Sequence, residues 1–167
     1  MTDAADRPLA IVDIDGVVAD VRHRLHHLHG RRKDWRAFFA AARHDEPHPE
    51  GLAIVERLRA DHEVVFLTGR PRELGTDTQA WLDRHGLGGH RLVMRPAGDR
   101  RPAARVKVEQ LRALARGRTV AVVVDDDPDV IAAMAAAGHP TFLADWEPRQ
   151  ADDDQVLHRA QEDEGRT

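Results

Sequence analysis

Five short apolar runs divide the chain, and this pattern constrains its fold more than any other feature. They cover residues 9–14, 63–68, 91–95, 119–125 and 140–144. Most are continuous rather than alternating with polar residues, which is typical of strands in a parallel sheet that are buried on both faces. Segments with helical patterning separate the runs. The sequence therefore predicts a Rossmann-like α/β fold, with a parallel sheet and helices on both of its faces.

The predicted helices have recognisable start and stop residues. Asp34 is a suitable N-cap, and Pro128 occupies a position in a first turn, where proline is favoured. Glycines are suitable C-terminal stops for three of the helices, at Gly86, Gly117 and Gly138. The expected helices cover residues 34–43, 49–61, 77–86, 106–117 and 128–138.

Residues from about 18 to 50 depart from this alternation of strands and helices. They follow the first predicted strand, yet they contain no simple crossover helix. We interpret them as a small helical insertion, or mini-cap, that folds over the edge of the sheet. The predicted main domain, residues 1–147, includes this insertion, and residues 148–167 form a polar, acidic C-terminal tail that ends in a frayed helix or in disorder.

Composition excludes several classes of protein. The 167 residues include no cysteine, so disulfides, thiolate chemistry and zinc sites built on Cys are excluded. No apolar run approaches the roughly 20 residues of a membrane helix, and the polar N-terminus does not resemble a signal peptide. The net charge of −4 argues against broad, unspecific binding to nucleic acid. We therefore expect a cytoplasmic protein without a membrane partner.

Polar residues appear where three of the predicted strands end. The carboxyl ends of parallel strands meet at one edge of a sheet, and ligands bind beyond that edge in open α/β folds. We therefore expect these side chains to lie close together in a site. The residues are Asp13 and Asp15 after the first run, Thr68, Gly69 and Arg70 around the end of the second, and Asp125, Asp126 and Asp127 at the fourth.

This set of residues suits phosphoryl transfer. Clustered carboxylates raise one another's pKa, and a hard divalent cation such as Mg²⁺ removes that penalty. One aspartate can then attack a phosphoryl group, while a second exchanges protons with the leaving group. Thr68 and a lysine can neutralise the phosphoryl oxygens. Lys107 is the candidate lysine, because it lies at the predicted start of a helix just before the acidic strand.

Four segments, in this order, resemble the motifs of the haloacid dehalogenase phosphohydrolase superfamily: "DIDGV", "LTGR", Lys107 and "VVVDDDPD". The first motif usually reads DxDGT, and here Val17 replaces the Thr. Further stretches are similar to the phosphatase module of polynucleotide kinase/phosphatase. They include "DVRHRLHHL", the "D.P" of residues 45–47, "VVFLTGRP" and "LVMRPAGDRRPAARVKVEQL". The resemblance covers residues of about 8 to 145.

The resemblance implies a Mg²⁺-dependent phosphatase that forms an aspartyl-phosphate intermediate. Asp13 would be the nucleophile and Asp15 the general acid/base. Mg²⁺ would be held by Asp13, the backbone carbonyl of Asp15, Asp126 and, directly or through water, Asp125. The phosphoryl group would be bound by Thr68, Gly69 and Lys107. Apart from the resemblance, Arg24 is a candidate for binding the substrate because it follows the first motif closely enough to reach a phosphate. Arg70 is a second candidate, although it could instead pair with one of the acids.

The substrate that the resemblance implies is a 3′-phosphate at a nucleic-acid end. The sequence contains no G-x-x-x-x-G-K-[ST] motif of a kinase. A kinase or ligase activity would then come from a separate partner, and free nucleoside monophosphates are an alternative substrate. Two basic groups could attract phosphate or could simply be solvated surface: Arg22, Arg24, Arg31, Arg32 and Lys33, and Arg95, Arg100, Arg101 and Arg105.

A phospho-acceptor signalling domain is an alternative of another class. Receiver domains also surround an aspartyl phosphate with acids, Mg²⁺, Thr and Lys. Their order along the chain differs, since here the Asp13–Asp15 pair comes first and Lys107 precedes the final acids. Asp15 would also supply the acid/base that drives turnover, which favours the phosphatase.

Overall fold

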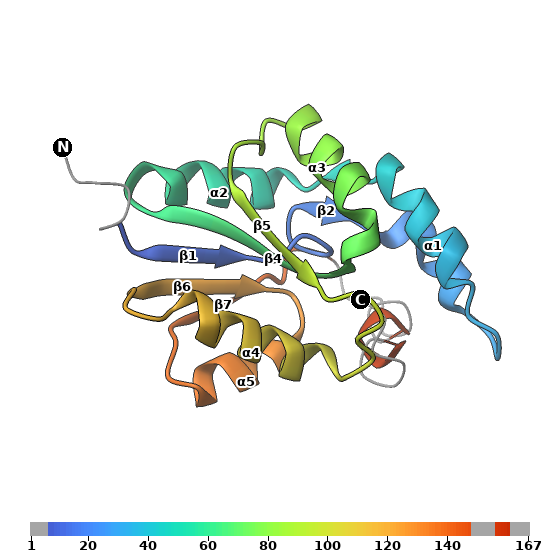
Figure 1. The fold of residues 1–167 in the computed structure, drawn as a ribbon. Helices are drawn as coiled ribbons and strands as arrows, with labels where there is room; N and C mark the ends of the chain where they lie inside the picture. The colour runs from blue at the N-terminus through green and yellow to red at the C-terminus, as the bar shows by residue number, and fades with distance from the viewer. Residues whose placement is uncertain (1–6, 148–155, 161–167) are drawn as a thin grey trace.

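A five-stranded parallel sheet between two layers of helices forms the body of the protein in the computed structural model, which describes residues 7–147 and 156–160 (Figure 1). Neighbouring strands are all parallel, in the order β5-β4-β1-β6-β7. This confirms the predicted α/β architecture. The strands are β1 (Leu9–Val12), β4 (Glu63–Pro71), β5 (Arg91–Arg95), β6 (Val120–Asp125) and β7 (Thr141–Leu143).

The central strand β1 is buried on both faces, as its continuous apolar run predicts. Ala10 and Val12 belong to one hydrophobic cluster, whereas Leu9 and Ile11 belong to another, because successive side chains of a strand point to opposite faces. Two helices cover each face (Figure 1). They are α2 (Pro49–Asp61) and α3 (Gly75–Arg84) on one face, and α4 (Ala103–Leu114) and α5 (Pro128–Ala136) on the other.

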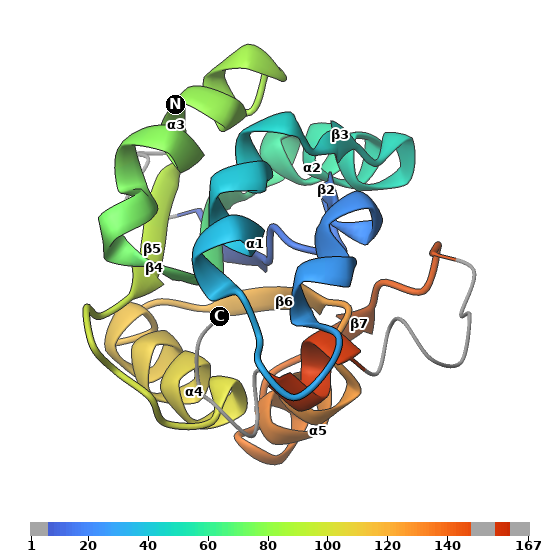
Figure 2. The same ribbon diagram turned by 90° about the vertical axis from the view of Figure 1, so that its right-hand side faces the viewer.

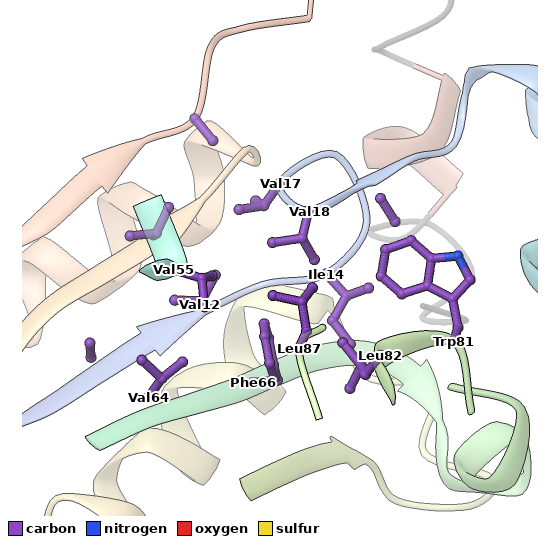
Figure 3. Close-up of a cluster of buried hydrophobic side chains, with 14 residues drawn as sticks. Val12, Ile14, Val17, Val18, Val55, Val64, Phe66, Trp81, Leu82 and Leu87 are labelled. Atoms are coloured by element: carbon purple, nitrogen blue, oxygen red, sulfur yellow. The ribbon is translucent and has the colours of Figure 1, made fainter. Parts of the chain in front are cut away.

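The cluster between the sheet and α2 and α3 also contains the loop that follows β1 (Figure 3). Val17 and Val18 of this loop are fully buried and lie near Val12 and Trp81 of the same cluster. Packing of this kind fixes the course of the chain directly after β1. The cluster therefore holds in place the loop in which Asp15 lies.

The helix ends agree with the sequence to within two residues except at α4. The side chain of Asp34 accepts a hydrogen bond from the Ala37 amide, as an N-cap does. Helix α4 begins at Ala103, three residues before the predicted start. Alanine and arginine are strong helix formers, so the residues that follow Pro102 extend the helix backwards. Lys107 consequently lies in the second turn rather than at the helix start.

The inserted segment, residues 21–45, is enclosed by a small antiparallel pair of strands, β2 (Ala19–Asp20) and β3 (Glu46–Pro47). Because its two ends pair with each other, the segment leaves and rejoins the fold at one place. It lies across the carboxyl ends of the parallel strands (Figure 2). The segment contains three short helices, η2 (Arg22–Leu28), α1 (Trp35–Ala41) and η3 (Ala42–His44). Outside this segment, the short helix η4 (Arg72–Leu74) follows β4.

The inserted segment has its own hydrophobic cluster. Trp35 and Phe38 are buried in it, and the ring of Trp35 stacks on that of Phe39 at 5.7 Å. The aromatic residues therefore pack the interior of the segment. The same cluster includes Leu157 and Ala160 of the helical residues 156–160, so these residues cover the segment's apolar side. The rest of the predicted C-terminal tail, residues 148–155 and 161–167, lies outside the described residues.

Every helix within the described ranges is too short or too polar to cross a membrane.

Candidate active site

The carboxyl ends of β1, β4 and β6 bring the predicted polar residues to one edge of the sheet. Val12 pairs with Phe66 on one side and with Val124 on the other. Asp13, which follows Val12, donates its amide to the carbonyl of Val124 at 2.9 Å. Asp125 follows Val124 directly and ends β6, so Asp13 and Asp125 lie on adjacent strands at the same level.

Lys107 connects these two aspartates. Its ammonium nitrogen Nζ lies 2.9 Å from Asp13 Oδ2 and 2.7 Å from Asp125 Oδ2. The other oxygen of Asp13 accepts the amide of Ile14 at 2.8 Å, and that of Asp125 accepts the amide of Asp127 at 3.0 Å. All three charged side chains are nearly buried. Both carboxylates are therefore held in fixed orientations.

One lysine does not neutralise this group of acids. Burial raises the pKa of Asp13 well above its usual value, and the charges of Asp125 and Asp126 raise it further, although Lys107 acts in the opposite direction. Burial lowers the pKa of Lys107, but Asp125 and Asp13 outweigh that effect and raise it above its usual value. Lys107 thus stays charged, and the group retains an excess of negative charge that would favour a second cation.

The donor set fits a hard divalent cation. Asp13, Asp125 and Asp126 each offer a carboxylate oxygen, and these three oxygens lie within 4.8 Å of one another. Oxygen donors of this kind suit Mg²⁺. Gly16 allows the loop after β1 to approach Asp126, because a Cβ there would lie 2.1 Å from Asp126 Oδ2 and the φ angle is +76°. The predicted Asp15 ligand is a backbone carbonyl and is not part of this side-chain group.

Asp126 also has a partner that the sequence gave no reason to expect. His158 Nε2, from residues 156–160, lies 3.1 Å from Asp126 Oδ2. Burial raises the pKa of Asp126 to about 6, although the hydrogen bond from His158 opposes that change. Burial lowers the pKa of His158, but the hydrogen bond to Asp126 outweighs it and raises the pKa to about 9. No periodicity or motif distinguishes His158 within its polar surroundings.

Asp15 is held by two arginines. Its Oδ1 accepts Arg24 Nη2 at 2.8 Å and Arg70 Nε at 3.0 Å. Burial would raise the pKa of Asp15, but the charges of Arg24 and Arg70 outweigh it and lower the pKa to about 2. Asp15 Oδ2 and Arg24 Nη1 are buried without a hydrogen-bond partner among the described residues. The described residues therefore leave the hydrogen-bonding capacity of both atoms unused.

Asp45 joins the two arginines from the other side. Its carboxylate accepts Arg24 Nε at 2.7 Å and Arg70 Nη2 at 2.9 Å, and its side chain is fully buried. The backbone carbonyl of Asp45 accepts the indole N–H of Trp81 at 2.8 Å. The "D.P" stretch was part of the family resemblance, but the sequence alone suggested no role for Asp45. Its partners come from two distant segments, which only the fold brings together.

Thr68 and Gly69 lie at the end of β4, next to β1. Thr68 is buried, and its Oγ1 accepts the amide of Arg70 at 3.2 Å. Asp127, which the sequence placed among the polar residues of the site, is the N-cap of α5 and accepts the amide of Asp129 at 2.8 Å. The structure thus brings Asp13, Asp125, Asp126 and Lys107 together, with the arginine-bound Asp15 beside them in sequence.

The two predicted basic groups are only partly exposed. Arg24 and Arg95 are buried, so neither lies on an open phosphate-attracting rim. Arg101 is paired with Asp99 and Glu109, each at 2.7 Å. By contrast, Arg31 and Arg32 are exposed on the inserted segment.

Comparison with known proteins is informative for most of the chain. Residues 8–145 match the family described as the polynucleotide kinase PNKP phosphatase domain. No curated protein sequence matches the chain.

Solved structures are similar in fold. A chain in the structure of the Pnkp1/Rnl/Hen1 RNA repair complex superposes with a TM-score of 0.68 at 20% identity, over 82% of this chain and 42% of that one. A haloacid dehalogenase-like hydrolase from Streptococcus pneumoniae gives 0.62 at 12% identity, over 90% of both chains. A putative phosphoglycolate phosphatase from Lactobacillus plantarum gives 0.60 at 13% identity, over 92% and 91%. The chain thus spans less than half the length of the matched chain in the RNA repair complex.

Proposed function

Because the chain belongs to the family of the polynucleotide kinase PNKP phosphatase domain, and is thereby a phosphoric monoester hydrolase, we propose that it removes 3′-phosphates from the ends of nucleic acids. The reaction passes through a phosphoryl group on Asp13. In this proposal residues 1–147 are the catalytic domain, and residues 148–167 are an appended segment.

The observation that carries the proposal is the position of Asp13. Its carboxylate is fixed at the carboxyl end of the central strand by the Ile14 amide at 2.8 Å and by Lys107 at 2.9 Å. A carboxylate held in this way needs little reorganisation before it attacks phosphorus. The bond from Asp13 to phosphorus forms while the bond from phosphorus to the sugar oxygen breaks. Water then releases phosphate and restores Asp13.

Mg²⁺ would be held by Asp13, Asp126 and the backbone carbonyl of Asp15, with Asp125 directly or through water. When bound, it would offset the negative charge of the acids and of the phosphoryl oxygens. Support comes from the three carboxylate oxygens within 4.8 Å of one another and from the surplus of acids over Lys107.

Asp15 is the general acid/base in this proposal. Its Oδ1 is bound to Arg24 and Arg70, whereas Oδ2 has no partner among the described residues. Oδ2 is therefore the oxygen that would exchange a proton with the leaving group and then with water. The negative charge of a phosphate bound beside Asp13 would raise the pKa of Asp15 towards that of a usable acid.

The phosphoryl oxygens would be bound by Thr68, the backbone around Gly69, and Lys107. Lys107 carries a fixed charge next to Asp13. The hydroxyl oxygen of Thr68 already accepts the Arg70 amide, which leaves its hydrogen free to donate. Such donors stabilise charge that develops during transfer.

A nucleic-acid end is the substrate that family membership favours. The exposed Arg31 and Arg32 give the inserted segment positive surface charge. The matched chain of the Pnkp1/Rnl/Hen1 RNA repair complex was solved as part of an assembly, which supports a separate kinase or ligase partner for this chain. Free nucleoside monophosphates are the alternative substrate.

The test is a panel of phosphate-release assays with Mg²⁺. The substrates are 3′-phosphorylated DNA and RNA oligonucleotides, their 5′-phosphorylated counterparts and free mononucleotides. The proposal expects kcat/KM to be highest for a 3′-phosphorylated oligonucleotide. A preference for mononucleotides would make the protein a nucleotidase. A stable phosphoprotein without turnover would indicate a phospho-acceptor domain.

A further inference from the structure

The strand that carries Thr68 is irregular at its functional end. Thr68 of β4 pairs with Met94 of β5, but the next pair is Pro71 with Arg95, so Gly69 and Arg70 form a bulge. Bulges of this kind interrupt the ladder of backbone hydrogen bonds and often re-aim a side chain beside an active site. Here the bulged residues include Arg70, whose side chain binds Asp15.

The side chain of Arg95 binds the backbone of this bulge. It is 2% exposed, and its Nε donates to the carbonyl oxygen of Gly69 at 3.2 Å. Its Nη1 donates to the carbonyl oxygens of Asp99 and Arg101 at 3.3 and 2.8 Å, in the loop that follows β5. Arg95 therefore connects that loop to the catalytic end of β4.

The carbonyl of Gly69 belongs to the same planar peptide unit as the amide of Arg70. That amide donates to Thr68 Oγ1 at 3.2 Å. Because the unit is rigid, a group that fixes its oxygen also fixes the direction of its N–H. Arg95 thus acts at one end of the peptide and Thr68 is bound at the other. The orientation of this peptide decides whether the Arg70 amide can donate to Thr68 Oγ1. That hydrogen bond in turn limits the directions in which the hydroxyl hydrogen of Thr68 can point.

We propose that Arg95 is a positioning residue for phosphoryl transfer, acting through the Gly69–Arg70 peptide on the Thr68 hydroxyl. This inference rests on the proposed function, in which Thr68 binds a phosphoryl oxygen. The sequence suggested Arg95 as part of a surface rim, whereas its burial and its carbonyl acceptors assign it to the interior of the site.

Arginine suits this position because its planar fork can serve several acceptors in fixed directions. Lysine carries the same charge but a single nitrogen on a flexible stem. Arg95→Lys should keep the charge and most of the apolar packing, yet lose the simultaneous contacts with Gly69 and with the loop. Arg101→Met is the matched control, because it removes loop ion pairs to Asp99 and Glu109 without touching Gly69.

The test combines kinetics with p-nitrophenyl phosphate, Mg²⁺ binding by calorimetry and the exchange rate of the Arg70 amide by NMR. For Arg95→Lys we expect kcat to fall by about tenfold, equivalent to about 1.4 kcal/mol of barrier. We expect Mg²⁺ affinity to be unchanged and the Arg70 amide to exchange faster. Arg101→Met should match the parent in all three. If Arg95→Lys does not fold, the same measurements are made on Arg95→Gln.

A double-mutant cycle then asks whether Arg95 acts through Thr68. In a Thr68→Val background, Arg95→Lys should lower kcat by much less than in the parent, because the shared route is already lost. The inference would be overturned if Arg95→Lys lowered kcat in the Thr68→Val background by the same factor as in the parent. It would also be overturned if Arg101→Met lowered kcat as much as Arg95→Lys does. The inference also fails if folded Arg95→Lys keeps the parent kcat and the parent amide exchange.

The amide measurement separates this inference from the proposed function. If the parent protein hydrolyses no phosphate ester, the proposed function fails. In that case, faster exchange of the Arg70 amide in Arg95→Lys than in the parent would still support the role of Arg95 in fixing this peptide. If Thr68→Val leaves turnover intact, both the phosphoryl contact of Thr68 and the inference are wrong.

Discussion

The carboxylate of Asp45 accepts two hydrogen bonds from the guanidinium of Arg24, at 2.7 and 2.8 Å, and neither side chain is exposed. Arg24 and Arg70 each bind both Asp15 and Asp45. The inserted segment, which supplies Arg24 and Asp45, is thereby connected to the loop after β1. Two acids balance two arginines in this buried group, so the loss of any one member leaves a charge without compensation.

Asp45→Asn should destabilise the protein strongly. The variant leaves Arg24 and Arg70 buried with one carboxylate fewer, and breaking such a buried pair costs about 3–5 kcal/mol. Asp20→Asn is the matched control, since Asp20 pairs with the half-exposed Arg22 and should lose no more than about 1 kcal/mol. Urea denaturation gives both free energies of unfolding. Equal losses in the two variants would contradict the buried balance of charge.

Asp13→Asn should abolish turnover while the fold is kept. The amide has the shape of the carboxylate but is not a nucleophile, so we expect kcat to fall by roughly a thousandfold or more. Burial and neighbouring acids raise the pKa of Asp13, so its ionisation at neutral pH costs the metal-free protein stability. The variant should therefore melt at or above the temperature of the metal-free parent. Activity close to the parent value would disprove the assignment of Asp13.

Mg²⁺ should stabilise the protein through Asp126. At a hundredfold excess over its dissociation constant, a ligand that binds only the folded state adds about 2.7 kcal/mol. In a protein of this size that raises the melting temperature by roughly 5–10 °C. Asp126→Ala should lose most of this increase. Asp129→Asn, an exposed acid in the first turn of α5, should retain it. A chelator that leaves ester hydrolysis at full rate would contradict the metal site.

Charge reversal of Arg31 and Arg32 tests the substrate class. Both are exposed on the inserted segment, away from the buried group around Asp15. We expect the double glutamate variant to raise KM for a 3′-phosphorylated oligonucleotide and to leave p-nitrophenyl phosphate unaffected. The salt dependence of oligonucleotide binding should flatten by about 0.7 per lost phosphate contact. Equal KM values for parent and variant would argue for a mononucleotide substrate.

The fold was largely predictable because its information is local. Continuous apolar runs mark strands buried on both faces, and caps such as Asp34 and Asp127 mark helix starts through contacts within three residues. The acids at strand ends follow from the same pattern. The start of α4 was misplaced by three residues, because Ala103 and Ala104 extend a helix without any polar signal.

The supporting residues of the site were not predictable in the same way. Asp45 binds partners 21 and 25 residues away, and His158 meets Asp126 across 32 residues. Neither contact leaves a periodicity in the sequence. Arg95 stands among other arginines in a polar stretch, and its partners are backbone carbonyls of the β4 bulge and of the loop after β5. Such roles depend on contacts that only the folded chain brings together, which sequence patterns do not show.

The most direct test of the account is to follow the phosphoryl group itself. The parent protein is mixed with Mg²⁺ and an oligonucleotide that carries a radiolabelled 3′-phosphate, and the reaction is quenched in acid within one turnover. We expect transient label on the peptide that contains Asp13, decaying as free phosphate appears, and no label in Asp13→Asn. Release of phosphate without labelled protein at any time, or label on another peptide, would contradict it.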